Sequence, residues 1–312
     1  MKSQVSIHPF FSIVIPVYNR FAMLQETVRS ILEQTFQSFE IIIVNDGSTD
    51  GSGTEMDNKY GSAPGILLIH QPNLERGASR NNGFRNSKGE YVIFLDSDDI
   101  LLPDHLQVLQ DKIQDLQFPD FIATKYDFLR GGSRVKSIIS RYSEGYYDYR
   151  FFLNGNPYGC NVCVRRKNEK LCLFEEDRKY SIKEDWLFFL QNLQQQKIFL
   201  VDKVTLLMVD HDDRSMRSDN RLLVEKTFYA KEWILKHVKL NPAERKQLDA
   251  HVHYFCAIHT YLDHERGKAL KFLFAAIRFG GIKRKYLILL AKIIAGRKGI
   301  VILSKWTGRK TF

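Results

Sequence analysis

Three carboxylates follow directly on an apolar segment near the first third of the chain. Residues 91–95 form a continuous apolar run, which is typical of a strand buried on both faces, and Asp96, Asp98 and Asp99 end it. Side chains at positions i and i+2 of an extended segment point to the same side, so we expect Asp96 and Asp98 to face one object together. Such oxygen ligands suit a hard divalent cation, Mn²⁺ or Mg²⁺. The alternative is a solvated acidic turn that caps a helix beginning near Pro103.

Polar residues also stand where other predicted elements begin or end. Parallel strands bring their carboxyl ends to one edge of a sheet, so clusters that follow strands are expected to converge there. A carboxylate at the N-terminus of a helix is favoured by the N–H groups there, which we expect to lower the pKa of Asp185 and keep it ionised. These clusters are Pro16, Tyr18 and Asn19 after the first strand, Asn45 and Asp46 after the second, and Glu184 and Asp185 at a helix start.

Strand-like and helix-like segments alternate through the first two thirds of the chain. This alternation predicts an α/β fold, Rossmann-like, with a mostly parallel sheet flanked by helices. No Gly-x-Gly-x-x-Gly and no Gly-Lys-Ser/Thr loop follows the first strand, which excludes a dinucleotide fingerprint and a phosphate loop of that type. From residue 221 onward the pattern becomes helical and basic, so we expect domains at 1–219 and 220–312. The predicted strands are 11–17, 39–44, 65–70, 91–95, 121–128, 158–165 and 197–209, and the predicted helices 24–32, 76–87, 106–116 and 184–193.

The net charge of +10 is unevenly distributed along the chain. Residues 220–312 hold 20 Lys and Arg against 6 Asp and Glu, whereas residues 1–219 are slightly acidic. Basic amphipathic helices are typical of membrane-surface elements, so we expect this region to bind a peripheral membrane surface. The alternative is a helical extension packed on the first domain. We expect no nucleic acid as a partner, because no nucleic-acid motif accompanies the charge.

Targeting segments and a metal site at the cysteines are not expected. Residues 1–9 lack the apolar core of a signal peptide, and no run of about 18 uncharged apolar residues occurs. Cys160 and Cys163 form a Cys-x-x-Cys, but a fourth zinc ligand at suitable spacing is not evident, so we expect buried free thiols in a reducing compartment. The expected location is cytoplasmic, with the inner face of the cell membrane as the surface that the basic region would reach.

The order of these motifs resembles that of the family 2 glycosyltransferases, which have the GT-A fold. The resemblance runs from about residue 11 to about residue 215, and the motifs are specific together rather than singly. Asn45 departs from the family pattern, in which Asp is common. The motifs are Ser-Ile-Val-Ile-Pro-Val-Tyr-Asn (12–19), Ser-Ile-Leu-Glu-Gln-Thr-Phe (30–36), Phe-Glu-Ile-Ile-Ile-Val-Asn-Asp-Gly-Ser-Thr-Asp (39–50), Arg-Gly-Ala-Ser-Arg-Asn-Asn-Gly (76–83) and Gly-Glu-Tyr-Val-Ile-Phe-Leu-Asp-Ser-Asp-Asp (89–99).

The resemblance implies a role for each cluster and favours the metal site over the solvated turn. It implies that Asp185 is the general base, with Glu184 the next candidate, and that Asp98 and His211 contact the metal. For the nucleotide, it implies that the pocket is edged by Pro16, Tyr18 and Asn19, and that Asp46 accepts a hydrogen bond from the base, typically uracil. It also implies that Arg80 helps to hold the nucleotide and that Asp96 lies near the ribose and the metal.

The implied activity is the metal-dependent, inverting transfer of one sugar from a nucleotide-diphosphate sugar, expected to be a UDP-sugar, to a hydroxyl of a glycan or lipid-linked acceptor in polysaccharide biosynthesis. The Gln-x-x-Arg-Trp signature of processive synthases is absent after Asp185, which favours a single transfer. One alternative is a non-catalytic sugar-nucleotide-binding or scaffold protein, against which the retained aspartates argue. A nucleotidyltransferase is the more remote alternative, because it would normally have a Gly-rich basic loop after the first strand.

Overall fold

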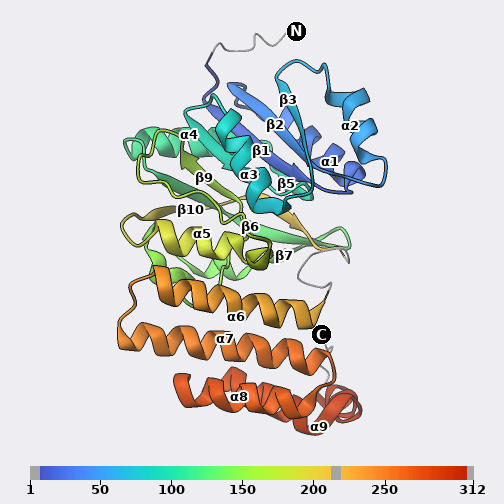
Figure 1. The fold of residues 1–312 in the computed structure, drawn as a ribbon, viewed down its shortest axis with the longest axis vertical. Helices are drawn as coiled ribbons and strands as arrows, with labels where there is room; N and C mark the ends of the chain where they lie inside the picture. Colours follow the sequence, from blue (N-terminus) through green and yellow to red (C-terminus); the bar gives the residue numbers. More distant parts are fainter. Residues whose placement is uncertain (1–7, 212–218, 308–312) are drawn as a thin grey trace. The chain divides into compact units, whose positions relative to one another are not determined.

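The computed structural model describes residues 8–211 and 219–307 and divides the chain into two compact units. The first comprises Met1–Phe152 and Asn156–Asp212, and the second comprises Leu153–Gly155 and Asp213–Phe312. The first unit holds one large sheet with helices, and the second is helical (Figure 1). The predicted boundary between residues 219 and 220 lies at the start of helix α6 (Asn220–His237).

Within the described residues, ten strands form one mixed sheet in the order β3-β2-β1-β4-β9-β6-β10-β5, with β7 paired to β6 and β8 to β10. Strands β1, β2, β3 and β4 are parallel neighbours, β9 is antiparallel to β4 and β6, and β10 is parallel to β6. The mostly parallel α/β sheet predicted from the sequence is thereby confirmed. The strands are β1 (Phe11–Val17), β2 (Phe39–Asp46), β3 (Ile66–Gln71), β4 (Tyr91–Phe94), β5 (Asp99–Leu101), β6 (Phe121–Arg130), β7 (Ser133–Lys136), β8 (Gly145–Tyr147), β9 (Val162–Arg165) and β10 (Ile198–Val209).

The strands at the centre of this sheet form its core. Every residue of β1 and β4 is buried, because helices cover both faces of the sheet. The one polar residue of β1, Ser12, donates its hydroxyl to Glu40 Oε1 at 2.6 Å. Phe11 of β1 is in register with Phe39 of β2 and with Tyr91 of β4. The carboxyl ends of these three strands therefore meet at one edge of the sheet, as the sequence pattern predicts.

Helices of the first unit connect the strands and pack on them. Helix α3 lies against β1 and β2, and a Cβ atom at its Gly83 would overlap Val14 of β1, so the glycine permits this close approach. The helices are α1 (Phe21–Leu32), α2 (Ser52–Tyr60), α3 (Glu75–Asn86), α4 (His105–Asp115) and α5 (Glu184–Asn192), with 3-10 turns η1 (Ile138–Arg141), η2 (Tyr149–Phe152) and η3 (Arg178–Tyr180).

The second unit is built from α6, α7 (Pro242–Leu262), α8 (Arg266–Gly280) and α9 (Arg284–Thr307). Each helix packs on the next one along the chain. Helix α7 begins with a capping box between Asn241 and Glu244 and has Pro242 in its first turn, which together satisfy free N–H groups. Its partners α8 and α9 share a small core with it, and Leu273 and Leu289 contribute to this core.

Some elements differ from the sequence predictions. Helix α2 and strand β5 were not predicted, because α2 is polar over most of its length and β5 is only three residues long. Leu32, an apolar residue at the end of the predicted helix 24–32, is 53% exposed. Cys160 and Cys163 are buried free cysteines, as predicted.

The strand predicted at 158–165 begins only at Val162. The preceding residues form a turn in which the Asn156 side chain accepts from the N–H of Tyr158 at 2.9 Å and donates to the carbonyl of Gly159 at 2.6 Å. Gly159 has a φ of +64°, outside the range of an extended strand. The turn allows Asn161 to approach the residues that follow β4.

Candidate active site at the carboxyl edge of the sheet

A cavity of about 290 Å³ lies at the carboxyl ends of β1 and β2. The predicted nucleotide-contacting residues Pro16, Tyr18, Asn19 and Asp46 all line it. Its walls also include Arg20 and Arg76, to which the sequence analysis assigned no role. The cavity therefore combines an aromatic side chain, amide and carboxylate groups and two guanidinium groups, a composition suited to a polar, negatively charged ligand.

Short polar side chains hold together the two turns at the mouth of this cavity. The backbone N–H of Asn19 donates to Ser48 Oγ at 3.0 Å, and the N–H of Thr49 donates to Asn19 Oδ1 at 2.8 Å. Asn19 has a φ of 53°, a left-handed conformation that asparagine adopts more readily than most residues. The polar residues after β1 and β2 are thus explained by reciprocal bonds between the two turns.

Asp46 is almost fully buried and has a fixed orientation. Its Oδ1 accepts from Gln71 Nε2 and from the backbone N–H of Leu74, both at 2.8 Å. Two donors compensate the loss of water around the carboxylate. The arrangement presents a pre-oriented acceptor group at the cavity, and base recognition by Asp46 remains a prediction.

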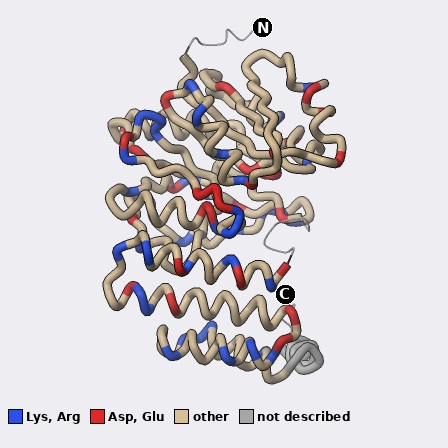
Figure 2. The backbone as a smooth tube through the Cα atoms, viewed as in Figure 1, with Lys and Arg blue, Asp and Glu red and all other residues tan. Residues whose placement is uncertain are grey.

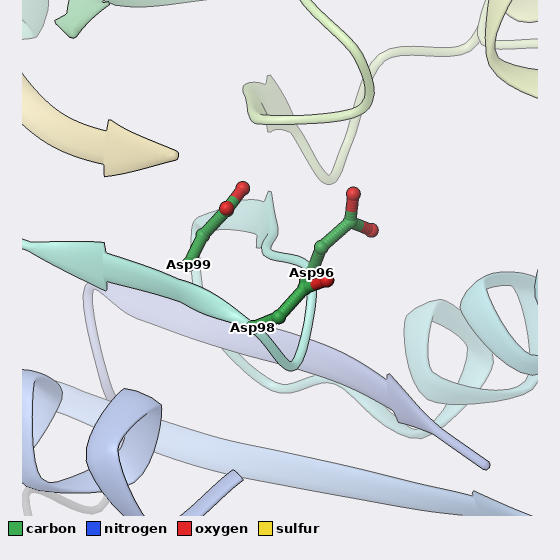
Figure 3. A group of neighbouring side chains, drawn as sticks. All are labelled: Asp96, Asp98 and Asp99. Atoms are coloured by element: carbon green, nitrogen blue, oxygen red, sulfur yellow. The ribbon is translucent and has the colours of Figure 1, made fainter. Parts of the chain in front are cut away.

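The acidic cluster, defined as Asp96, Asp98 and Asp99, lies on the turn after β4 and at the first residue of β5 (Figure 3). Each residue offers an oxygen atom within 4.8 Å of the others. The expectation that Asp96 and Asp98 are aligned by an extended strand is wrong, because β4 ends at Phe94 and the N–H of Asp99 donates to the carbonyl of Asp96 at 3.2 Å. The turn brings the carboxylates together instead.

Cationic and amide groups surround the acidic cluster. Asp98 Oδ2 lies 3.1 Å from Arg20 Nη1 and 2.7 Å from His211 Nε2, so the structure brings together both predicted metal-contacting residues. Asp99 is 1% exposed, and its Oδ2 accepts from Asn161 Nδ2 at 2.6 Å. An all-oxygen donor set with an adjacent imidazole fits a hard divalent cation, and the more exposed Asp96 and Asp98 are the carboxylates able to reach it.

Arg80 occupies a different position from the one implied by its predicted nucleotide contact. Its guanidinium is 1% exposed, with Nη2 2.7 Å from Asp96 Oδ1 and Nη1 2.9 Å from Glu184 Oε1. It also lies over the ring of Phe174 at 5.3 Å. Arg80 is not among the described residues that line the cavity. It acts here as a buried bridge between α3, the turn after β4 and the start of α5.

Asp185 stands in the first turn of α5, next to this bridge. Its Oδ1 accepts from the N–H of Trp186 at 2.6 Å, and the Trp186 ring N–H donates to the carbonyl of Phe152 at 2.7 Å. Burial, followed by the nearby charge of Glu184, raises the pKa of Asp185 to about 6. The expectation of a lowered pKa is therefore wrong: the helix N–H groups act in that direction, but desolvation is the larger effect.

Arg20 and Asn161, like Arg76, are site residues to which the sequence prediction gave no role. Arg20 directly follows Asn19, and a basic residue beside a predicted anion site was a usable signal. Asn161 lies between two cysteines in a segment with strand-like alternation, so its sequence context gave no sign that it would contact Asp99. Only the turn at Gly159 places it there.

Comparison with known proteins identifies relatives of this architecture. A family model described as glycosyl transferase family 2 matches residues 12–171. An uncharacterized glycosyltransferase of Rickettsia typhi is 28% identical over 259 residues, which cover 81% of this chain and 79% of that protein. The glycosyltransferase GlyA of Streptococcus pneumoniae is 39% identical over 123 residues, 38% of this chain, but the match spans only 17% of GlyA.

The fold is also similar to that of a solved structure, S. aureus TarS 1-349 in complex with UDP-GlcNAc. The two share 20% sequence identity with a TM-score of 0.63, over 97% of this chain and 93% of that one. At this identity the likeness concerns the fold, and it confirms the GT-A architecture.

Proposed function

Because this chain belongs to glycosyl transferase family 2, we propose that it transfers a single sugar from a UDP-sugar to a hydroxyl group, with inversion at the anomeric carbon. The observation that carries the proposal is the convergence, at one edge of the sheet, of a polar cavity, an acidic cluster and a carboxylate with a raised pKa. The donor, the acceptor, the metal and the stereochemistry are all parts of this proposal.

The cavity of about 290 Å³ is proposed to hold the nucleotide. Asp46 would accept a hydrogen bond from the base, and the ring of Tyr18, which is 43% exposed, offers a surface against which the base can lie. Arg20 and Arg76 would face the negatively charged diphosphate. The TarS fragment with the same fold binds UDP-GlcNAc, which supports a uridine nucleotide.

Asp96 and Asp98 would hold a divalent cation, Mn²⁺ or Mg²⁺, with His211 close to Asp98. When bound, such an ion supplies positive charge that stabilises the departing diphosphate. The chain's own residues contribute to the same end: Arg20 lies on the cavity wall within 3.1 Å of Asp98, where it can balance charge on the leaving group. Asn161 and Arg80 hold Asp99 and Asp96 in place from the buried side.

Asp185 would act as the general base. A sugar hydroxyl is a weak nucleophile until its proton is removed during attack, and a base whose pKa lies near the working pH performs this transfer efficiently. The pKa of about 6 leaves Asp185 mostly ionised at neutral pH yet more basic than an ordinary carboxylate. Its hydrogen bond from the Trp186 N–H fixes one oxygen, so the carboxylate keeps one orientation.

The acceptor is proposed to be a glycan or a lipid-linked sugar. The polar region between β6 and η2, rich in tyrosine, is one candidate surface for acceptor recognition. A protein that kept the fold and nucleotide binding without turnover is the competing proposal, and a nucleotidyltransferase is disfavoured by membership of family 2.

A donor screen tests the proposal directly. Purified protein would be incubated with a panel of nucleotide sugars and simple glycan acceptors, with Mn²⁺, with Mg²⁺ or with chelator, and nucleotide release would be measured. We expect UDP release with one UDP-sugar, dependent on the divalent ion and lost in Asp185→Asn, although Asp185→Asn still binds UDP. Binding of UDP without release from any donor and acceptor pair would instead support the non-catalytic alternative.

A further inference from the structure

Helix α9 of the second unit has apolar residues on two opposite faces. One face packs into the core shared with α7 and α8 through Tyr286, Leu289 and Ile293. On the other face Leu287 and Ile288 are 50% and 49% exposed. An amphipathic surface helix normally presents polar residues to solvent, and a helix that is apolar all round is normally covered on every side.

The exposed residues form a continuous surface rather than scattered positions. Positions 287, 288, 291 and 294 are separated by three, four and seven residues, the spacing of one helical face. Ile294 on this face is 69% exposed, and Ile282 in the turn before α9 is 75% exposed. We call Leu287, Ile288, Ala291 and Ile294 the α9 outer face. The described residues leave about half or more of the Leu287, Ile288 and Ile294 side chains exposed.

Positive charge adjoins the α9 outer face. Lys283, Arg284 and Lys285 are exposed at the start of α9. On α8 the exposed positions 271, 274 and 278 share a helical face and are Lys, Phe and Arg, and Figure 2 shows basic positions along this helix. Residues 266–312 contain 13 Lys and Arg and no Asp or Glu. An aliphatic strip with exposed cations, in a segment of the sequence that contains no acid, has the composition of an interfacial helix.

We propose that the α9 outer face inserts into the headgroup region of an anionic lipid membrane, with Lys283 and Arg284 on its lipid phosphates, whereas the Lys285 ammonium lies over the Tyr254 ring at 4.6 Å on the core side of the helix. Charge decides between occupants: a second copy of this chain would bring a like-charged surface against it, whereas an anionic lipid complements it. Within the described residues no helix is long and apolar enough to cross a membrane, so the contact is one of lying on the surface. The proposal names a lipid partner and does not depend on the proposed sugar transfer.

Vesicle co-sedimentation of the full-length protein tests this. We expect binding to phosphatidylcholine vesicles that contain phosphatidylglycerol, little binding to phosphatidylcholine alone, and a decrease with added salt as the attraction is screened. The variant L287N/I288N changes only exposed side chains and should weaken binding by about tenfold or more, equivalent to about 1.4 kcal/mol. Its matched control is Leu32→Asn, which removes a leucine of similar exposure (53%) from the first unit and should bind like wild type.

A second pair of variants tests whether vesicle binding depends on the basic residues beside the α9 outer face or on the overall charge of the protein. K283Q/R284Q should reduce vesicle binding strongly, whereas K236Q/K239Q, which removes the same charge from exposed positions at the end of α6 and beyond it, should reduce it much less. Equal losses in the two, or wild-type binding by L287N/I288N, would overturn the proposal. So would a wild-type dimer that L287N/I288N converts to monomer, which would assign the face to self-association. UDP binding, measured in the same samples, should be unchanged in every variant. If the wild-type protein does not bind UDP, that result contradicts the proposed nucleotide site in the first unit and leaves the membrane proposal unaffected.

Discussion

Replacing Asp185 by Asn should remove catalysis and at the same time stabilise the protein. The carboxylate has an ordinary pKa of 3.8 and a pKa of about 6 in the folded chain, because burial and Glu184 disfavour its charged form. The folded state therefore holds the proton more tightly than the unfolded state does. The stability from this group is fully present below about pH 4 and is lost as the pH rises through about 6.

The size of the effect follows from that shift. One pKa unit corresponds to about 1.36 kcal/mol, so ionisation of Asp185 lowers the free energy of unfolding by a few kcal/mol at pH 7.5 and by less at pH 5. Asparagine has no charge to bury and can still accept from the Trp186 N–H. Asp185→Asn should therefore gain up to these amounts, with the larger gain at the higher pH, while turnover falls by about 10²–10⁴.

Urea unfolding followed by circular dichroism at pH 5 and pH 7.5 measures the stability difference. Asp115→Asn, at an exposed position at the end of α4, is the control and should change little at either pH. In wild type, kcat should fall to about a tenth of its plateau at pH 5, because only about a tenth of Asp185 is then ionised. A gain of stability that is the same at both pH values, or a rate that is flat down to pH 4.5, would refute the assignment of a buried base.

Further consequences concern the rest of the site and the sheet. In calorimetry with Mn²⁺ present, Asp98→Ala should bind UDP more than tenfold more weakly than wild type, and a chelator should not change the affinity of the variant further. If the affinity of the variant depends on the metal as that of wild type does, the ion lies elsewhere. Arg80→Met should lower the free energy of unfolding by about 3–5 kcal/mol, because two carboxylates lose their buried cation. Gly83→Ala should cost about 1–3 kcal/mol in the same measurement, since the new Cβ would overlap Val14, whereas Gly267→Ala in α8 meets no atom within 4 Å and should be nearly neutral.

The sequence was sufficient for the parts of this fold that depend on local pattern. The predicted range of β1 agrees with the structure, and those of β2 and β3 agree to within two residues, because long apolar runs ended by turn residues leave few alternatives. The convergence of Tyr18, Asn19 and Asp46 followed from one rule, that carboxyl ends of parallel strands share an edge. Motif order along the chain was enough to indicate the family.

Interactions between distant segments were beyond that kind of prediction. The partner of Arg80 is Glu184, 104 residues away, and the partner of Asp98 is His211, 113 residues away. The pKa of Asp185 was predicted in the wrong direction because a helix N-terminus is visible in the sequence, whereas the depth of burial is not. Desolvation depends on what covers a group, and that is decided by the whole fold.

The bridge through Arg80 links the two chemical halves of the site. Asp96, on its Nη2, belongs to the acidic cluster proposed for the metal and donor, and Glu184, on its Nη1, precedes the proposed base. Because Arg80 is 1% exposed, water cannot take the place of either carboxylate as a hydrogen-bond partner of its guanidinium. The guanidinium also lies over the ring of Phe174. The two carboxylates come from segments far apart in the sequence, so the guanidinium fork sets the distance between the acidic cluster and the first turn of α5. Arg80 therefore acts on the site through these two carboxylates, and it is not among the described residues that line the cavity.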